Sequence, residues 1–202
     1  MLATKDIFMQ PYSNACAHAA IINLCKLRGL ETPSFDQIET GLQVLMSVSG
    51  SRIGDQDAPK AIDILNFLVT SGFICALVGI PPALWAEPQK ILTQFLDQGC
   101  HLLLFFNWRN TNGSVVTHVT LVEGYDERGY QVIDGEPGYY PEGAPFELEP
   151  QELSAEEEEK VRKWLENHSH GSRRTLPFYG IGLNTTENLA LGLTQHALVV
   201  YE

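Results

Sequence analysis

Positive charge is scarce in this chain. Thirteen lysine and arginine residues stand against 25 aspartate and glutamate residues, which gives a formal net charge of −12. Such a surface argues against binding nucleic acid or an anionic membrane through a basic patch. No apolar run reaches the roughly 18 residues of a membrane-spanning helix, and the first residues lack the pattern of a cleavable signal. We therefore expect a soluble, cytoplasmic protein, although export without a cleavable signal would leave the same pattern.

Paired cysteines are missing as well. The four cysteines stand at positions 16, 25, 75 and 100, without a CxxC spacing. We therefore expect free thiols, no disulfide framework and no metal site, and nothing in the sequence predicts a cofactor. His18 lies two residues after Cys16, but residues two apart do not share a helix face. A solvent or loop contact is therefore expected for His18, and not metal ligation.

What the chain does contain is a helical first half and a strand-rich second half. Its 202 residues and 44% hydrophobic content fit one domain over residues 1–202. Apolar spacing predicts helices over 16–28, 35–45, 59–70 and 87–98. Strands are predicted over 73–80, 101–108, 115–125, 130–134 and 197–201. We expect an α+β fold, with a mainly helical lobe over 1–100 and a sheet lobe over 101–202.

The last third of the chain carries an acidic stretch. A capping-box pattern and an apolar stripe predict a helical insertion near 150–170, and the polar residues 168–174 are expected to form a loop. We interpret the acidic residues as a solvated face and not as a ligand site; they are Glu147, Glu149, Glu152 and Glu156–Glu159.

Cys16 opens the first predicted helix, with Ser13 or Asn14 as the expected cap. Backbone N–H groups and the helix dipole at such a position favour the thiolate. Cys25, nine positions later, falls on the opposite side of the helix and is expected in the core. Free cysteines are usually small core residues, so Cys16 alone predicts no catalysis.

Three further residues supply what a cysteine nucleophile needs. A base, an orienting group and an oxyanion donor are required. His118 begins an apolar strand, Asp134 ends the next one, and Gln10 precedes Cys16 by six residues. The order of the four residues predicts a catalytic site. His196 also precedes an apolar strand, but no acid follows it, so His118 is the preferred base.

The spacing of the hairpin does not by itself predict contact between the base and the acid. With a turn centred near Glu127 and Arg128, facing residues have numbers that sum to about 255. Asp134 then pairs near Leu121, about 10 Å along the strand from His118. A bulge or strand twist is needed to bring the side chains together, so the hairpin is only compatible with the pair.

A resemblance covers most of residues 5–136. Four segments carry it: Gln10-x5-Cys16-x-x-Ala19, Gly99-Cys-His-Leu-Leu-Leu, His118-Val-Thr-Leu-Val-Glu-Gly-Tyr-Asp126 and Tyr130-Gln-Val-Ile-Asp134. Together they resemble papain-like cysteine peptidases of the group that removes double-glycine leader peptides from bacteriocins, and the free-standing relatives of that group. The resemblance implies a papain-like fold, Cys16 as nucleophile, His118 as general base and acid and Asp134 as its orienter. It also implies the Gln10 amide as oxyanion donor beside the Cys16 N–H.

The chain departs from that family at three positions. Ala15 and Ala17 stand where the family usually has an acidic residue and often has a glycine, and Gly135 replaces the customary proline after Asp134. None of these departures removes a catalytic group. Because of them, the leader-peptide preference is not carried over to this chain.

Peptide hydrolysis is the leading functional hypothesis, with a peptide or protein as substrate. The same catalytic residues also serve acyltransferases, transglutaminases and deamidases, including effectors delivered into another cell, because these differ in the second nucleophile. A catalytically silent peptide-binding domain is the alternative from another class. The oligomeric state is left open.

Overall fold

A single antiparallel sheet organises the part of the chain that the computed structural model describes, residues 2–10, 15–49, 59–84, 87–109, 115–135, 171–177 and 192–201. The sheet has the strand order β1-β6-β2-β3-β4-β5, and each neighbouring pair is antiparallel. Its strands are β1 (Cys75–Gly79), β2 (His101–Arg109), β3 (Val115–Asp126), β4 (Gly129–Asp134), β5 (Ser172–Pro177) and β6 (Gly192–Val200). The α+β class is therefore confirmed.

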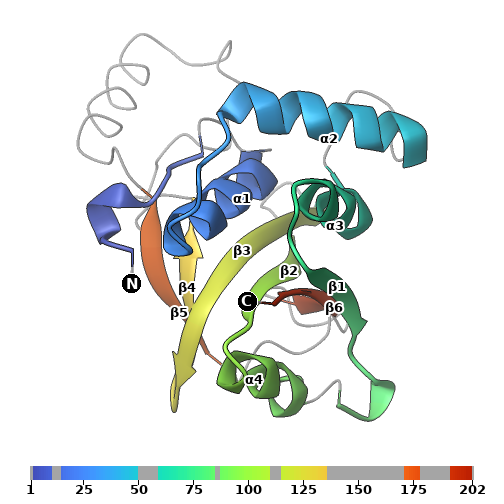
Figure 1. Ribbon diagram of the computed structural model, residues 1–202. Coiled ribbons are helices and arrows are strands. Elements are labelled where there is room, and N and C mark those ends of the chain that lie inside the picture. The colour runs from blue at the N-terminus through green and yellow to red at the C-terminus, as the bar shows by residue number, and fades with distance from the viewer. Residues whose placement is uncertain are drawn as a thin grey trace, which may run out of the picture.

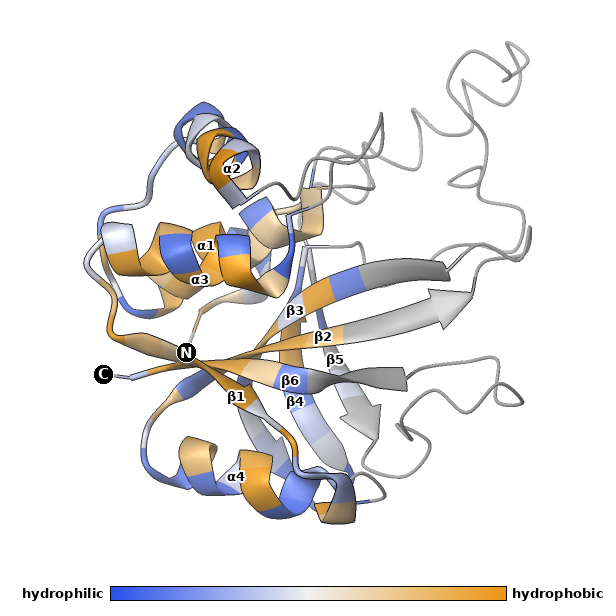
Figure 2. Ribbon diagram, turned by 90° about the vertical axis from the view of Figure 1, so that its right-hand side faces the viewer, coloured by the Kyte–Doolittle hydropathy of each residue, from blue (hydrophilic) through white to orange (hydrophobic). Residues whose placement is uncertain are grey.

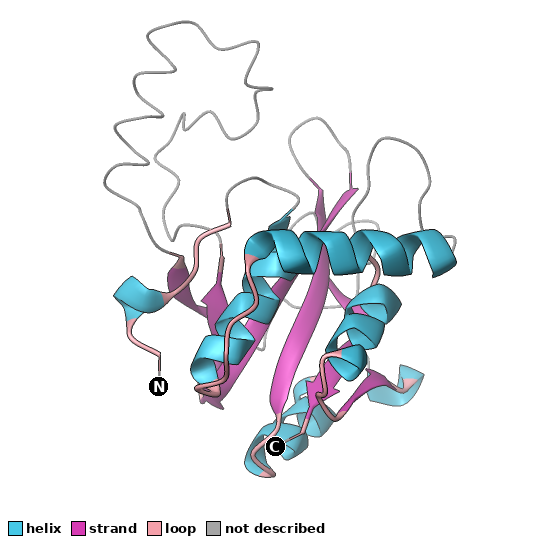
Figure 3. Ribbon diagram, turned by 45° about the horizontal axis from the view of Figure 1, so that its top comes forward, coloured by secondary structure: helices cyan, strands magenta, loops and turns pink. Residues whose placement is uncertain are grey.

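Helices cover both faces of this sheet (Figure 1). Figure 2 shows three of them on one side and α4 (Gln89–Asp97) on the other. The three are α1 (Cys16–Leu27), α2 (Phe35–Ser49) and α3 (Ala61–Thr70). Seen from above, α2 crosses over α1 and α3 (Figure 3). Short 3-10 turns are η1 (Thr4–Asp6) and η3 (Pro82–Leu84).

Strand alternation divides the core into two apolar clusters. On the α1 side lie Leu103, Phe105, Val119, Leu121 and Ile133, packed with the buried residues of α1 to α3. On the α4 side lie Leu102, Leu104, Val122, Val132 and Leu92. Successive strand residues point to opposite faces, so the continuous apolar run that begins at His101 contributes side chains to both clusters.

Most of the predicted elements are present, but one prediction was wrong. Residues 172–177, taken in part for a polar loop, form β5, which pairs with β4 from Gly129–Pro177 to Asp134–Ser172. A polar segment can form a strand at the sheet edge because backbone hydrogen bonds hold it, and one side can remain exposed. The sheet also includes β1, which belongs to the first hundred residues and which the sequence predicted as a short strand.

Several sequence predictions lie outside the described residues. They concern the acidic residues 147–159, the helical insertion near 150–170, and the proposed cap residues Ser13 and Asn14. Within the described ranges, no helix combines the length and apolar character needed to cross a membrane.

Candidate catalytic site

His118 and Asp134 form a buried pair at one end of the β3–β4 ladder. The Nε2 atom of His118 lies 2.9 Å from Oδ1 of Asp134 and 3.1 Å from Oδ2. Only 2% of the histidine surface and 3% of the aspartate surface are exposed. Because the carboxylate accepts the bond, the ring hydrogen belongs on Nε2. The Nδ1 atom is then the nitrogen that can exchange a proton with a nucleophile.

A β-bulge accounts for this contact. The register between β3 and β4 shifts by one residue between Val122 and Gly124, which leaves Glu123 as the extra residue of β3. Near the turn the numbers of paired residues sum to 255, as the sequence predicted, but beyond the bulge they sum to 254, as in Val122–Val132.

The shift of one residue decides which face Asp134 occupies. Leu121 pairs with Ile133, so one step further along the ladder Asp134 comes opposite Thr120. Thr120 and His118 are two residues apart and share a face, which makes His118 and Asp134 diagonal neighbours. In the register predicted from the turn alone, Asp134 would face Leu121 on the other side of the sheet.

The bulge residue is held from β5. The guanidinium of Arg173 forms a two-pronged ion pair with Glu123, in which Nη2 lies 2.9 Å from Oε2 and Nε contacts Oε1. Arg173 also donates to the backbone oxygen of Leu2 and, at 3.2 Å, to Oγ1 of Thr4. The same side chain thus ties the bulge to the N-terminal segment.

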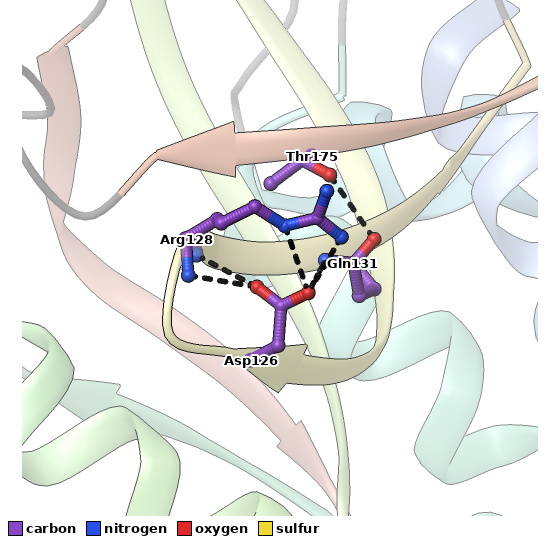
Figure 4. A network of polar contacts seen from close by, with 5 residues as sticks. Asp126, Arg128, Gln131 and Thr175 are labelled. Atoms are coloured by element: carbon purple, nitrogen blue, oxygen red, sulfur yellow. Dashed lines mark hydrogen bonds and ion pairs between the residues drawn. The ribbon is translucent and has the colours of Figure 1, made fainter.

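The turn between β3 and β4 is fixed by Asp126 (Figure 4). Its Oδ1 accepts the backbone N–H of Arg128 at 2.8 Å, and its Oδ2 accepts bonds from the Arg128 guanidinium and from Gln131. Thr175 of β5 donates to the other end of Gln131 at 3.2 Å. Hydrogen bonding to Arg128 lowers the pKa of Asp126, so the carboxylate remains an acceptor well into the acid range.

Gln10 lies beside the end of β4. Its backbone N–H donates to the oxygen of Gly135 at 2.9 Å, and 8% of its surface is exposed. Gly171, which immediately precedes β5, donates its N–H to the oxygen of Ile7 at 3.2 Å. The N-terminal segment, residues 2–10, therefore runs past the ends of β4 and β5, as Figures 1 and 3 show.

Cys16 is the first residue of α1 and is half-buried. The N-cap is Ala15, which makes no side-chain capping bond. Cys16 packs against the apolar cluster on the α1 side of the sheet, which includes Val119 and Ile133. Their chain neighbours His118 and Asp134 alternate to the opposite face of β3 and β4.

One turn into α1, the helix meets the end of β4. A Cβ atom added to Gly135 would lie 2.4 Å from Cβ of Ala19 and 3.5 Å from Cβ of Gln10. Ala19 is three residues from Cys16, on the same part of the helix surface. Gly135 follows Asp134 directly, so the first turn of α1 and Gln10 meet at the chain position next to Asp134, whose side chain lies with that of Val132 on the other face of β4 from Ile133.

The other histidines are placed differently. His18 is buried, which corrects the expected solvent or loop contact: its Nε2 lies 2.5 Å from Oε2 of Glu39, and its ring stacks on Phe35 at 4.6 Å between centroids. Burial lowers the pKa of His18, although Glu39 acts in the opposite direction. His196 is exposed on β6, opposite Gly79, while the partner of Asp134 is His118.

The remaining cysteines differ from Cys16 in position. Cys25 is buried in α1, as predicted, and burial raises its pKa. Cys75 on β1 is half-buried like Cys16, and burial raises its pKa too. Cys75 therefore provides an internal reference thiol for measurements on Cys16. A groove of about 720 Å³, lined by Leu27 and Arg28 among others, lies at the far end of α1 from Cys16.

Two side chains that organise this region were not predicted. Asn23 is fully buried in α1 and hydrogen bonds to the backbone of Phe8, and Arg173 holds the bulge. The signal for Asn23 was one amide within an otherwise apolar helical run. Arg173 offered no comparable signal, because its partner lies 50 residues away in the sequence.

No protein-family model matches the chain, and no curated protein matches it.

Proposed function

We propose that this chain is a cysteine peptidase of papain-like fold, with Cys16 as nucleophile, His118 as general base and acid, and Asp134 as the orienter of His118. The observation that carries the proposal is the buried bond between His118 and Asp134. An isolated pair of this kind costs several kcal/mol of desolvation. In the proposed mechanism the pair serves Cys16 as base and orienter, a chemical use that offsets such a cost.

The proposed reaction begins with the Cys16 thiolate, which the first turn of α1 favours. The sulfur attacks the peptide carbonyl carbon, an S–C bond forms, and the π electron pair moves to the oxygen. As the C–N bond breaks, protonated His118 gives its proton to the departing amine. Water then adds to the thioester, passes a proton to His118, and the thiolate leaves.

Gln10 is the proposed second donor to the oxyanion, beside the N–H of Cys16. Its position at the end of β4 supports this role, because a side chain there is close to the first turn of α1. Removal of one such donor typically lowers the rate about 10²–10³-fold.

Acyl transfer, transglutamination and deamidation use the same first step and are the second candidate. They differ only in what resolves the thioester and which carbonyl is attacked. A catalytically silent binding domain is disfavoured by the buried pair, since such a domain gains nothing from the desolvation of His118 and Asp134.

The decisive experiment compares Cys16 with Cys75 in the same molecule. We would measure alkylation by iodoacetamide from pH 5 to 9, assign each site by mass spectrometry, and repeat the measurement with His118→Ala. Labelling of Cys16 that is fast below about pH 7 and slows in His118→Ala, while Cys75 is labelled only at higher pH because burial raises its pKa, supports the proposal.

Labelling of Cys16 that follows the pH profile of an ordinary thiol, with a pKa of about 8.5, and does not change in His118→Ala would contradict it and favour the silent domain. If Cys16 is reactive, peptide libraries supplied with and without an added amine separate hydrolysis from acyl transfer, and ammonia release identifies deamidation.

A further inference from the structure

Asn23 occupies an unusual position for an amide. It lies in the middle of α1, where residues 17 to 25 are all buried, and none of its own surface is exposed. A buried amide without hydrogen bonds costs roughly 1–3 kcal/mol, so its partners matter. Asn23 lies seven residues after Cys16, which is nearly two helical turns, so the two residues share one side of α1.

The partners of Asn23 are both backbone atoms of one residue. Its Oδ1 accepts the N–H of Phe8 at 2.7 Å, and its Nδ2 donates to the oxygen of Phe8 at 3.2 Å. The amide thus binds the N-terminal segment as a neighbouring strand would. Two residues further on, the N–H of Gln10 donates to Gly135. The backbone is therefore held on the α1 side at Phe8 and on the β4 side at Gln10.

We propose that Asn23 is a positioning residue that fixes Gln10 for its role as oxyanion donor. This inference rests on the proposed function. Asn23 contacts neither the reacting atoms nor Gln10 itself; it acts through the backbone of Phe8. The bonds from Asn23 hold the backbone at Phe8, two residues before Gln10. This matters for catalysis because a donor displaced by about 1 Å loses much of its effect on the oxyanion.

Two reagents separate this role from general support of the site. Iodoacetamide alkylates a thiolate by displacing iodide, with one S–C bond formed and one C–I bond broken, and no oxyanion develops. p-Nitrophenyl acetate acylates the thiolate through a tetrahedral oxyanion, which collapses as the C–O bond breaks and p-nitrophenolate leaves. Only the second reaction needs Gln10.

The test measures both rates at Cys16 in native chain, Asn23→Asp, Asn23→Ser, Gln10→Ala and the double variant Asn23→Asp/Gln10→Ala. Asn23→Asp keeps the acceptor for the Phe8 N–H but sets a carboxylate against the Phe8 oxygen. We expect ester acylation to fall about 10–100-fold in both Asn23 variants, with alkylation changed less than twofold. In the Gln10→Ala background the Asn23 substitution should add little, because the two act as a unit.

Lys26→Met is the matched control. Lys26 also ties α1 to the N-terminal segment, by a 2.8 Å bond to the oxygen of Asp6 and by its Nζ, 5.8 Å from the centroid of the Phe8 ring, but these contacts leave the Phe8 backbone to Asn23. Its loss should leave ester acylation within twofold of native. Urea denaturation and circular dichroism show whether each variant is folded, and Asn23→Ser serves if the aspartate is not tolerated.

Three results would overturn the inference. The first is that the alkylation rate and the acylation rate fall together, which indicates only a structural role. The second is that neither rate falls in the Asn23 variants. The third is that the Asn23 substitution lowers acylation by the same factor when Gln10 is already alanine. If instead Cys16 of the native chain is no more reactive than Cys75 toward both reagents, the proposed function fails and this inference fails with it. A reactive native Cys16 with no effect of Asn23 leaves the proposed function standing and refutes the positioning role alone.

Discussion

Gly135 should be intolerant of even one additional methyl group. A Cβ atom at this position would lie 2.4 Å from Cβ of Ala19, whereas carbon atoms in contact prefer about 3.5–4.0 Å. Cβ of Ala19 is attached directly to the helix backbone, so it cannot rotate away. Gly135→Ala must therefore push α1 and the end of β4 apart by more than 1 Å, judged from the same contact range.

The cost follows from overpacking. Such insertions typically destabilise by about 1–3 kcal/mol, partly offset by about 0.4–1 kcal/mol because alanine restricts the unfolded chain. Urea denaturation should show the loss of stability, and the melting temperature should fall by about 2–4 °C for each kcal/mol in a chain of this length. Ester acylation of Cys16 should slow as well, because in the proposed mechanism the first turn of α1 must keep its position relative to the end of β4, which carries Asp134.

A second substitution tests the cause. Ala19→Gly removes the atom that Gly135→Ala would meet, at a cost of about 1 kcal/mol for glycine in a helix. In the double variant the clash is absent, so the two substitutions should couple by at least about 1 kcal/mol in the favourable direction. Gly79→Ala is the control, since a Cβ there has no atom within 4 Å. A Gly135→Ala variant as stable as Gly79→Ala, or a coupling energy near zero, would refute the reasoning.

Three further predictions concern the supports of the fold. Asp63→Ala should lower the free energy of unfolding by about 1–3 kcal/mol in urea denaturation, because this buried carboxylate accepts bonds from the Lys60 N–H at 2.9 Å and the Ser49 hydroxyl at 2.7 Å. Burial lowers the pKa of His18, so the unfolded chain binds the proton more tightly than the folded one. His18 should therefore contribute stability above the unfolded value of about 6.5 that is lost as pH falls below it, and His18→Gln should narrow the difference in urea midpoint between pH 7.5 and 5.5. Asp126→Ala should speed hydrogen exchange at the backbone amides of Arg128 and Gly129, which donate to the Asp126 carboxylate. The amide of Ile133 should stay protected, because only the bonds of the turn are removed.

Helices and most strands of this fold could be predicted because their signals are local. Apolar residues at helical spacing placed α1 to α4 with errors only at their ends, and the apolar runs placed β2, β3 and β6. The signal for β5 is not local, since most of its residues are polar and the ladder that they form with β4 makes them a strand. His18 was misplaced for a related reason: its partner Glu39 belongs to another helix.

The candidate site shows the same division between types of residue and their geometry. The order of Gln10, Cys16, His118 and Asp134 is readable in the sequence, whereas contact between the last two depends on one extra residue in β3. Because side chains alternate strictly along a strand, an error of one residue in register moves Asp134 to the opposite face. The bulge residue, Glu123, is held by an arginine 50 residues later in the chain. Turn position alone predicted the wrong face, so the ion pair across β3 and β5 belongs to the structural basis of the site as much as the catalytic residues do.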